Sequence, residues 1–166
     1  DALSEDATEA RVNEALQAIS TERDWPWLQT SETIATVAGT ATDSPPAGWM
    51  KTRVLCIDGE EPMEERSLAE IRGVPTTDRG QPTIYTISGD VMIFRPVPDG
   101  VYSIIHDYVK VEPALVADAN TPLMPEQFHY SIVSKAAELA HMRQRDNARA
   151  AQSLAEYNAW LGRMLD

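Results

Sequence analysis

Four carboxylates come closest to an arrangement that could do chemistry. Glu60, Glu61, Glu64 and Glu65 are near neighbours in the sequence. Two carboxylates held in an apolar cleft can act as the acid and the base of glycoside hydrolysis. These four fall beside turn signals, however, so a solvated acidic rim is the simpler interpretation. We name no catalytic residue, and a carboxylate-dependent hydrolase of cell-wall glycans is the weakest alternative for the function.

The histidines and the single cysteine do not form a recognisable site. His129 and His141 are 12 residues apart on one predicted helix, which turns their side chains about 120° away from each other. His106 and Asp107 are strand neighbours and point to opposite faces. Cys56 lies in an apolar strand, where we expect a buried, unreactive thiol. The sequence has no glycine-rich phosphate loop, GxSxG, CxxC or HExxH motif. We therefore predict no cofactor and no metal.

Two tryptophans flank a proline in the segment Asp24-Trp25-Pro26-Trp27. A pair of indoles can stack on a base or a sugar, but such sites also carry basic or hydrogen-bonding groups. The neighbours here are Asp24 and Leu28, so we expect the tryptophans to fill the core.

Composition limits the classes of partner. The chain has 166 residues, a formal net charge of −12 and one cysteine. A surface this acidic disfavours tight binding to nucleic-acid backbones, which needs clustered lysine and arginine. One cysteine excludes an internal disulfide and fits a reducing cytoplasm. No apolar run approaches the length of a membrane span, and the first residues, which lack a methionine, show no signal-peptide pattern.

Helices are predicted at both ends of the chain. Residues 4–20 form an amphipathic helix with Ser4 as N-cap. The C-terminal helical part covers residues 125–165, with Pro125 in the first turn. A short polar break at 144–147 divides it into a helical hairpin, and Asn147 caps the second helix. The second helix carries an apolar stripe on one side: Ala151, Leu154, Ala155, Asn158, Leu161 and Leu165.

The β-rich part is predicted between the helices, at residues 30–112. Residues 30–42 suggest a hairpin or a bent strand pair, 50–58 a buried strand and 62–65 a return strand. Ser67 and Glu70 form the capping box of a short helix that Gly73 ends.

The clearest local signal is an antiparallel meander within residues 80–113. Its strands are predicted at 83–88, 91–96 and 101–111. Gly89 suits a type II′ hairpin turn, and Pro98-Asp99-Gly100 marks a second reversal. Both faces of these strands are partly apolar, so we expect the sheet to be covered on both sides. The fold class is therefore α+β, in which the N-terminal helix and the C-terminal hairpin form a small bundle, with the meander domain between them. We expect residues 1–166 to act as a single domain.

Several stretches resemble one known family. The segments Gly80-Gln81-Pro82-Thr83-Ile84-Tyr85, Phe94-Arg95-Pro96-Val97-Pro98-Asp99 and Thr121-Pro122-Leu123-Met124-Pro125, followed by Phe128-His129 and an alanine-rich helical pair, look like the head–tail adaptor (connector) proteins of tailed bacteriophages. The resemblance covers most of the chain and is strongest over residues 80–130. Its motifs are turns and strand boundaries rather than catalytic residues.

The resemblance implies a structural role in the virion, without enzymatic activity. Such adaptors assemble as a homo-oligomeric ring, commonly a dodecamer, under the portal protein at the neck of the particle. They extend the DNA channel and offer a docking surface to the tail or stopper protein. The protein would be made in the host cytoplasm, contact no membrane and let DNA pass without specific binding. The main alternative within this class is a tail-completion or tail-tube subunit.

We expect the C-terminal end to make the partner contact. Trp160, Met164 and Leu165 are apolar residues near the terminus, and exposed apolar residues there can dock on the portal or on an adjacent subunit. The alternative is that they close the core of their own domain.

Overall fold

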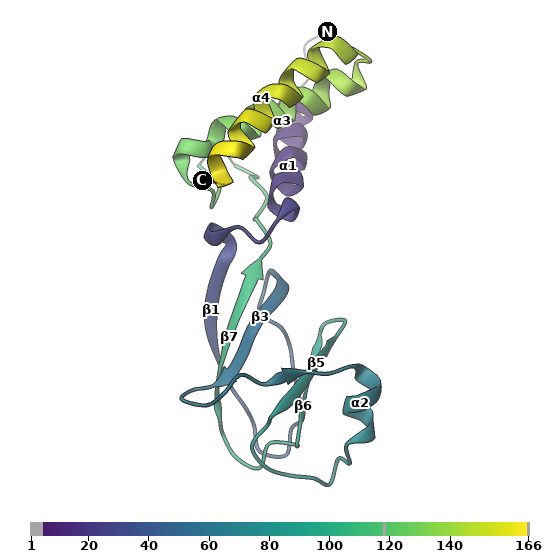
Figure 1. The fold of residues 1–166 in the computed structure, drawn as a ribbon, viewed down its shortest axis with the longest axis vertical. Helices are drawn as coiled ribbons and strands as arrows, with labels where there is room; N and C mark the ends of the chain where they lie inside the picture. The colour runs from purple at the N-terminus through teal and green to yellow at the C-terminus, as the bar shows by residue number, and fades with distance from the viewer. Residues whose placement is uncertain (1–4, 118, 166) are drawn as a thin grey trace. The chain divides into compact units, whose positions relative to one another are not determined.

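The computed structural model describes residues 5–117 and 119–165. The chain divides into two compact units (Figure 1). The helical unit comprises the described residues up to Leu28 and from Val111 onward, and the β unit comprises Gln29–Lys110. The α+β class is confirmed, with an N-terminal helix, a C-terminal helical pair and antiparallel sheets in the sequence between them. That the two units act as one domain stays a prediction.

The helical unit is built on three long helices: α1 (Glu5–Glu22), α3 (His129–Arg143) and α4 (Asn147–Leu165). Helix α3 packs against both α1 and α4. Short 3-10 turns lie at η1 (Pro26–Leu28) and η2 (Glu126–Phe128). The apolar stripe predicted for the first helix is buried, with Ala15, Leu16 and Ile19 fully inaccessible.

The ends of these helices differ in detail from the sequence prediction. The predicted cap Ser4 lies outside the described residues. Pro125 precedes the 3-10 turn η2, so α3 begins later, at His129. The cap of α4 is Asp146 rather than Asn147, because the Asp146 carboxylate accepts a hydrogen bond from the Arg149 backbone N–H at 3.1 Å. The predicted short helical hairpin is confirmed, and its turn passes through Arg145 at φ +60°.

The β unit contains two sheets. The first has the order β1-β7-β3, formed by Gln29–Ala35, Ser103–Lys110 and Trp49–Ile57. The second has the order β2-β6-β5-β4, formed by Thr42–Asp43, Val91–Arg95, Ile84–Ser88 and Glu64–Glu65.

This topology corrects the predicted meander. Strands β5 and β6 form the expected antiparallel hairpin, and Gly89 at its turn has φ +60°. The third strand, β7, leaves this sheet and pairs with β1 and β3 instead. The Pro98-Asp99-Gly100 reversal therefore carries the chain from one sheet to the other. A local turn signal marks a change of direction but does not specify which strand is joined next.

Three earlier strand predictions also change. Residues 30–42 are not a strand pair, because β1 and β2 belong to different sheets. Strand β3 is deeply buried only near its end, at Leu55 and Ile57. The return strand predicted at 62–65 is divided: Pro62 bridges Cys56 of β3 in the antiparallel sense, whereas strand β4 pairs in parallel with β5. The prediction was correct for the short helix α2 (Leu68–Gly73), whose capping box from Ser67 and Glu70 is present.

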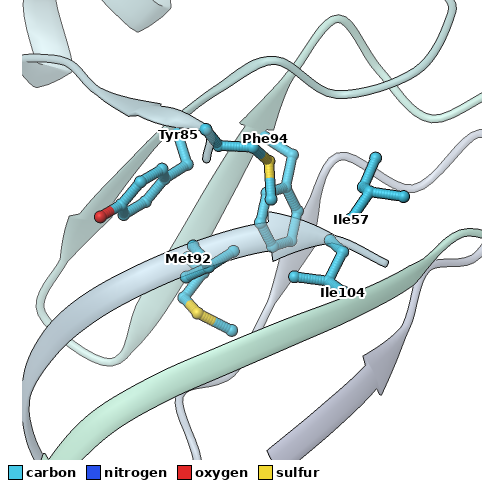
Figure 2. Close-up of a cluster of buried hydrophobic side chains, with 7 residues drawn as sticks. Ile57, Tyr85, Met92, Phe94 and Ile104 are labelled. Atoms are coloured by element: carbon cyan, nitrogen blue, oxygen red, sulfur yellow. The ribbon is translucent and has the colours of Figure 1, made fainter. Parts of the chain in front are cut away.

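The core of the β unit lies between its two sheets (Figure 2). Its centre is Phe94, 2% exposed, with residues from both sheets around it. The full cluster is Leu55, Ile57, Met63, Tyr85, Met92, Phe94 and Ile104. From Ile104 to Tyr108 burial alternates along β7, with Ile104 and His106 inaccessible and Ile105 half-buried, but Val109 is inaccessible as well. The face of the β1-β7-β3 sheet that carries Ile104 and His106 is therefore covered within this chain. That the opposite face is fully covered as well stays a prediction.

Candidate functional site

The α3–α4 hairpin buries polar side chains between its helices. Ser131, Ser134 and Glu138 of α3 are buried, as are Ser153 and Tyr157 of α4. The hydroxyls of Ser131 and Ser134 donate to backbone carbonyls of the preceding turn, at 2.7 and 3.2 Å. Serine can therefore occupy a helix interface without an unsatisfied hydroxyl, and its small volume lets the helices approach closely.

A charged network joins all three long helices. The Tyr157 hydroxyl donates a hydrogen bond to the Glu22 carboxylate of α1. The Lys135 Nζ lies 2.8 Å from Glu138 Oε2 and 5.0 Å from the centre of the Tyr157 ring. Burial, with a further contribution from Glu22, raises the pKa of Tyr157. The phenol is therefore neutral at physiological pH and acts as a donor.

The outward face of α4 is apolar. It consists of residues that we call the α4 seam: Ala151, Leu154, Asn158, Leu161 and Leu165. Leu154 is 38% exposed and Leu165 47% exposed. These are five of the six residues of the stripe predicted from the sequence, without Ala155. Leu161 is half-buried and the other four are exposed. The charged residues of α4, Arg149, Glu156 and Arg163, form a separate column seven residues apart.

The outward face of α3 has the same character. We call Tyr130, Val133, Ala137 and Ala140 the α3 seam. Tyr130 is 62% exposed and Val133 56% exposed, while the two alanines are half-buried. The helix has three lysine, arginine or acidic residues, Lys135, Glu138 and Arg143, and none of them belongs to this face. Sequence periodicity predicts a different stripe on this helix. Of its residues Ile132 is buried, whereas the others are half-buried: Phe128, Ala136, Leu139 and Ala140.

The three predicted docking residues do not form one patch. Trp160 is half-buried, with its ring 6.0 Å from that of Tyr130 and 4.7 Å from the Arg163 guanidinium carbon. Met164 is half-buried as well, whereas Leu165 is exposed on the α4 seam. Trp160 and Met164 are therefore partly packed within their own unit, whereas Leu165 lies on the open surface.

The carboxylates that could do chemistry are in the β unit. Glu60, Glu61, Glu64 and Glu65 are all exposed, as expected for an acidic rim. Glu64 is paired with Arg66 at 2.7 Å, and the same arginine reaches Glu70 at 3.3 Å. The first three line an open hollow with Met63 and Pro82 among its walls. Because these carboxylates are exposed, they are not held in an apolar cleft of the kind that carboxylate acid–base catalysis requires.

The histidines serve structural contacts. His129 Nε2 lies 2.9 Å from the Met124 carbonyl oxygen, which confirms that it bonds a nearby loop. His106 is fully buried with its Nε2 2.8 Å from Thr52 Oγ1. Cys56 is half-exposed, so the expectation of a buried thiol was wrong. Among the described residues no group of three or more His, Cys, Asp or Glu is placed to hold a metal ion.

The tryptophans fill the helical core, as predicted. The rings of Trp25 and Trp27 stack with centroids 4.6 Å apart. Trp25 is 1% exposed and donates its indole N–H to the Ile19 carbonyl at 2.7 Å. A ring buried and bonded in this way has no face left for a base or a sugar.

Comparison with known protein families identifies the family to which this chain belongs. The chain is a phage head–tail adaptor in class, a structural protein of the virion neck. In particular, it belongs to the SU10 adaptor protein family, whose model matches residues 2–166. No significant match was found among curated proteins. In the described part of the chain no helix is both long enough and apolar enough to cross a membrane.

Proposed function

We propose that this protein forms a ring, commonly of twelve subunits, that docks under the portal, extends the DNA channel and provides the attachment surface for the tail. The observation that carries the proposal is the match to the adaptor family over residues 2–166. The outward apolar faces of α3 and α4 support it, because a chain that works alone in water gains nothing from exposing them.

The C-terminal end is the proposed contact with the portal or an adjacent subunit. Leu165 is 47% exposed, and Trp160 and Met164 retain partial exposure beside it in the sequence. The substitution Trp160→Ala tests this role. A variant that folds as a monomer but does not join the particle supports docking, whereas one that unfolds assigns Trp160 to the core of its own unit.

The proposed conduit carries DNA without binding it. The net charge of −12 repels phosphates rather than pairing with them. We expect acidic side chains on the channel wall and no retention of duplex DNA by the assembled ring at physiological salt. A basic wall in an assembled ring would contradict this part of the proposal.

The decisive experiment has two readouts. Native mass spectrometry of the full chain with the portal protein should give a ring whose mass is a multiple of the 18.4 kDa subunit, with twelve subunits expected. A particle reconstruction should place that ring between the portal and the tail. A position within the tail tube or at its far end would instead assign the chain as a tail-tube or tail-completion subunit.

A further inference from the structure

The two exposed seams of the helical unit both follow coiled-coil spacing. The α4 seam has successive separations of three, four, three and four residues, and the α3 seam has three, four and three. Apolar residues at alternating separations of three and four form the contact line of paired helices, in which each side chain enters a hole on the facing helix. This pattern points to a helix as the occupant of each seam.

The two seams do not face each other within one chain, although Tyr130, at the start of the α3 seam, lies with its ring 6.0 Å from that of Trp160 on α4. Helix α4 faces its own hairpin partner through Tyr157, which at about 100° per residue is turned roughly 80° from the centre of the α4 seam. Helix α3 faces α4 through residues that include Glu138, turned by a similar calculation roughly 120° from the α3 seam. The exposed fractions of Leu154 and Val133, 38% and 56%, agree with this geometry.

The flanks of both seams suit a close helix–helix contact. On α4 Ala155 and Gly162 directly follow the seam residues Leu154 and Leu161, and with Ala148 they form another column at seven-residue spacing. Residues this small let two helix axes approach. The column of Arg149, Glu156 and Arg163 lies away from the seam, so no charge would be buried by pairing.

The two seams also differ in size in a complementary way. The α4 seam offers three leucines as large side chains, whereas the α3 seam ends in Ala137 and Ala140 and presents a shallow surface. Asn158, in the middle of the α4 seam, is a polar residue at a contact position, and such residues fix register and partner choice.

We infer that the occupant is a second copy of this chain, with the α4 seam of one subunit packed against the α3 seam of the next. Two different faces on one unit that fit each other give a heterologous contact, and such contacts generate rings when the rotation closes. The inference rests on the proposed function, since it names the surfaces that would form the adaptor ring.

The test uses two variants that each break one seam. Leu154→Glu places a charge on the α4 seam and Val133→Glu places one on the α3 seam. Each variant alone should remain monomeric in sedimentation velocity under conditions in which the wild-type chain assembles. Mixed in equal amounts they should form a dimer and stop there, because each supplies the seam that the other has lost.

Met142→Glu is the matched control. Met142 is an exposed apolar residue of α3 with the same 56% exposure as Val133, and it does not belong to the seam. This variant should assemble as the wild type does. Unchanged circular dichroism would show that all three variants fold, and the mixed dimer itself demonstrates folding of its two components.

Several results would overturn the inference. One is a Val133→Glu chain that still self-associates, which would indicate a symmetric α4–α4 dimer. Another is a mixture that stays monomeric. A third is a pair of variants that assemble normally yet no longer bind portal-bearing heads, which would assign the seams to a partner protein. A wild-type chain that stays monomeric with the portal present would also end it.

Failure of the proposed function gives a different pattern. A ring that forms through these seams but lies outside the head–tail junction would leave the inference standing and remove the adaptor role. A ring that lies at the junction and is unaffected by both substitutions would support the adaptor role and overturn the inference about the seams.

Discussion

The two units of this protein distribute their apolar residues in opposite ways. The β unit places Phe94, Met92 and Ile104 between its sheets and exposes carboxylates such as Glu60. The helical unit also has an apolar core around Leu16 and Trp25, but most of the buried residues of α3 and α4 are serines, a glutamate and a tyrosine, beside Ile132 and Ala150. Its leucines and valines on those helices are partly exposed.

The difference indicates which unit is complete as a single chain. A sandwich of two sheets buries its own core, although Val37 and Val101 in its connections stay 62% and 75% exposed. A helical hairpin that holds polar groups inside and apolar residues outside is stable alone only through its caps, its network and its contact with α1. Its remaining apolar faces are the natural place for assembly contacts.

The largest effect should come from the sandwich core. Phe94→Ala removes a ring that is 2% exposed, between two sheets, and such truncations cost about 3–5 kcal/mol of unfolding free energy. Hydrogen exchange of the full chain should show faster exchange throughout strands β5, β6 and β7. Val91→Ala on the same strand is the control, since Val91 is 41% exposed. Protection that survives Phe94→Ala would mean that the two sheets do not depend on a common core.

The polar interior of the helical unit should give the next effect. Tyr157→Phe removes only the hydroxyl and leaves the Glu22 carboxylate without this donor. The bond is only partly buried, because Glu22 is exposed, so its loss should cost about 1 kcal/mol, the net contribution of a typical hydrogen bond. Urea unfolding, followed by tryptophan fluorescence, would measure it, since three of the four tryptophans lie in the same unit. Tyr130→Phe is a matched control, because Tyr130 is 62% exposed. Equal stability of the two variants would show that the buried network contributes nothing.

A smaller effect should appear on acidification of the β unit. Burial lowers the pKa of His106, against an opposing contribution from Asp107. The unfolded chain therefore takes up the proton first as pH falls below about 6.5. The stability due to the neutral ring is present above that pH and is lost as pH falls through the lower, folded-state pKa. In the wild type the protection factors of the β7 amides, corrected for the slower intrinsic exchange at lower pH, should fall between pH 7 and pH 5. The His106→Gln variant should lack this component, and an identical pH response in it would assign the effect to other groups.

Sequence reasoning succeeded where the signal is local. The Ser67–Glu70 capping box, the Gly89 turn and the helical hairpin all depend on a few adjacent residues, and all are present. It failed where partners are distant in the sequence. Strand β7 follows β6 directly, yet it pairs with β1, because the competing pairings differ only in long-range packing that alternation along one strand cannot reveal.

The sequence predicted which residues of α4 form an apolar stripe, but not what that stripe contacts. Periodicity identified the apolar stripe on α4 correctly, including Leu154 and Leu161. It could not tell whether that stripe faces α3 or another chain, since both contacts require the same residues at the same spacing. The decisive information is the burial of Ser153 and Tyr157 on the neighbouring face of α4, which a hydrophobicity pattern does not register.

The smallest effect is expected for truncation of Leu154, and it tests most directly whether the helical unit leaves its apolar residues exposed. Leu154→Ala in a monomeric Val133→Glu background should change the unfolding free energy by no more than about 0.5 kcal/mol, the range of surface substitutions. Leu16→Ala in the same background should cost about 2–5 kcal/mol, because Leu16 is inaccessible. Thermal unfolding of the two double variants provides the measurement. A large loss of unfolding free energy in the Leu154→Ala variant would mean that Leu154 packs within its own chain. The helical unit would then bury its apolar residues as the β unit does.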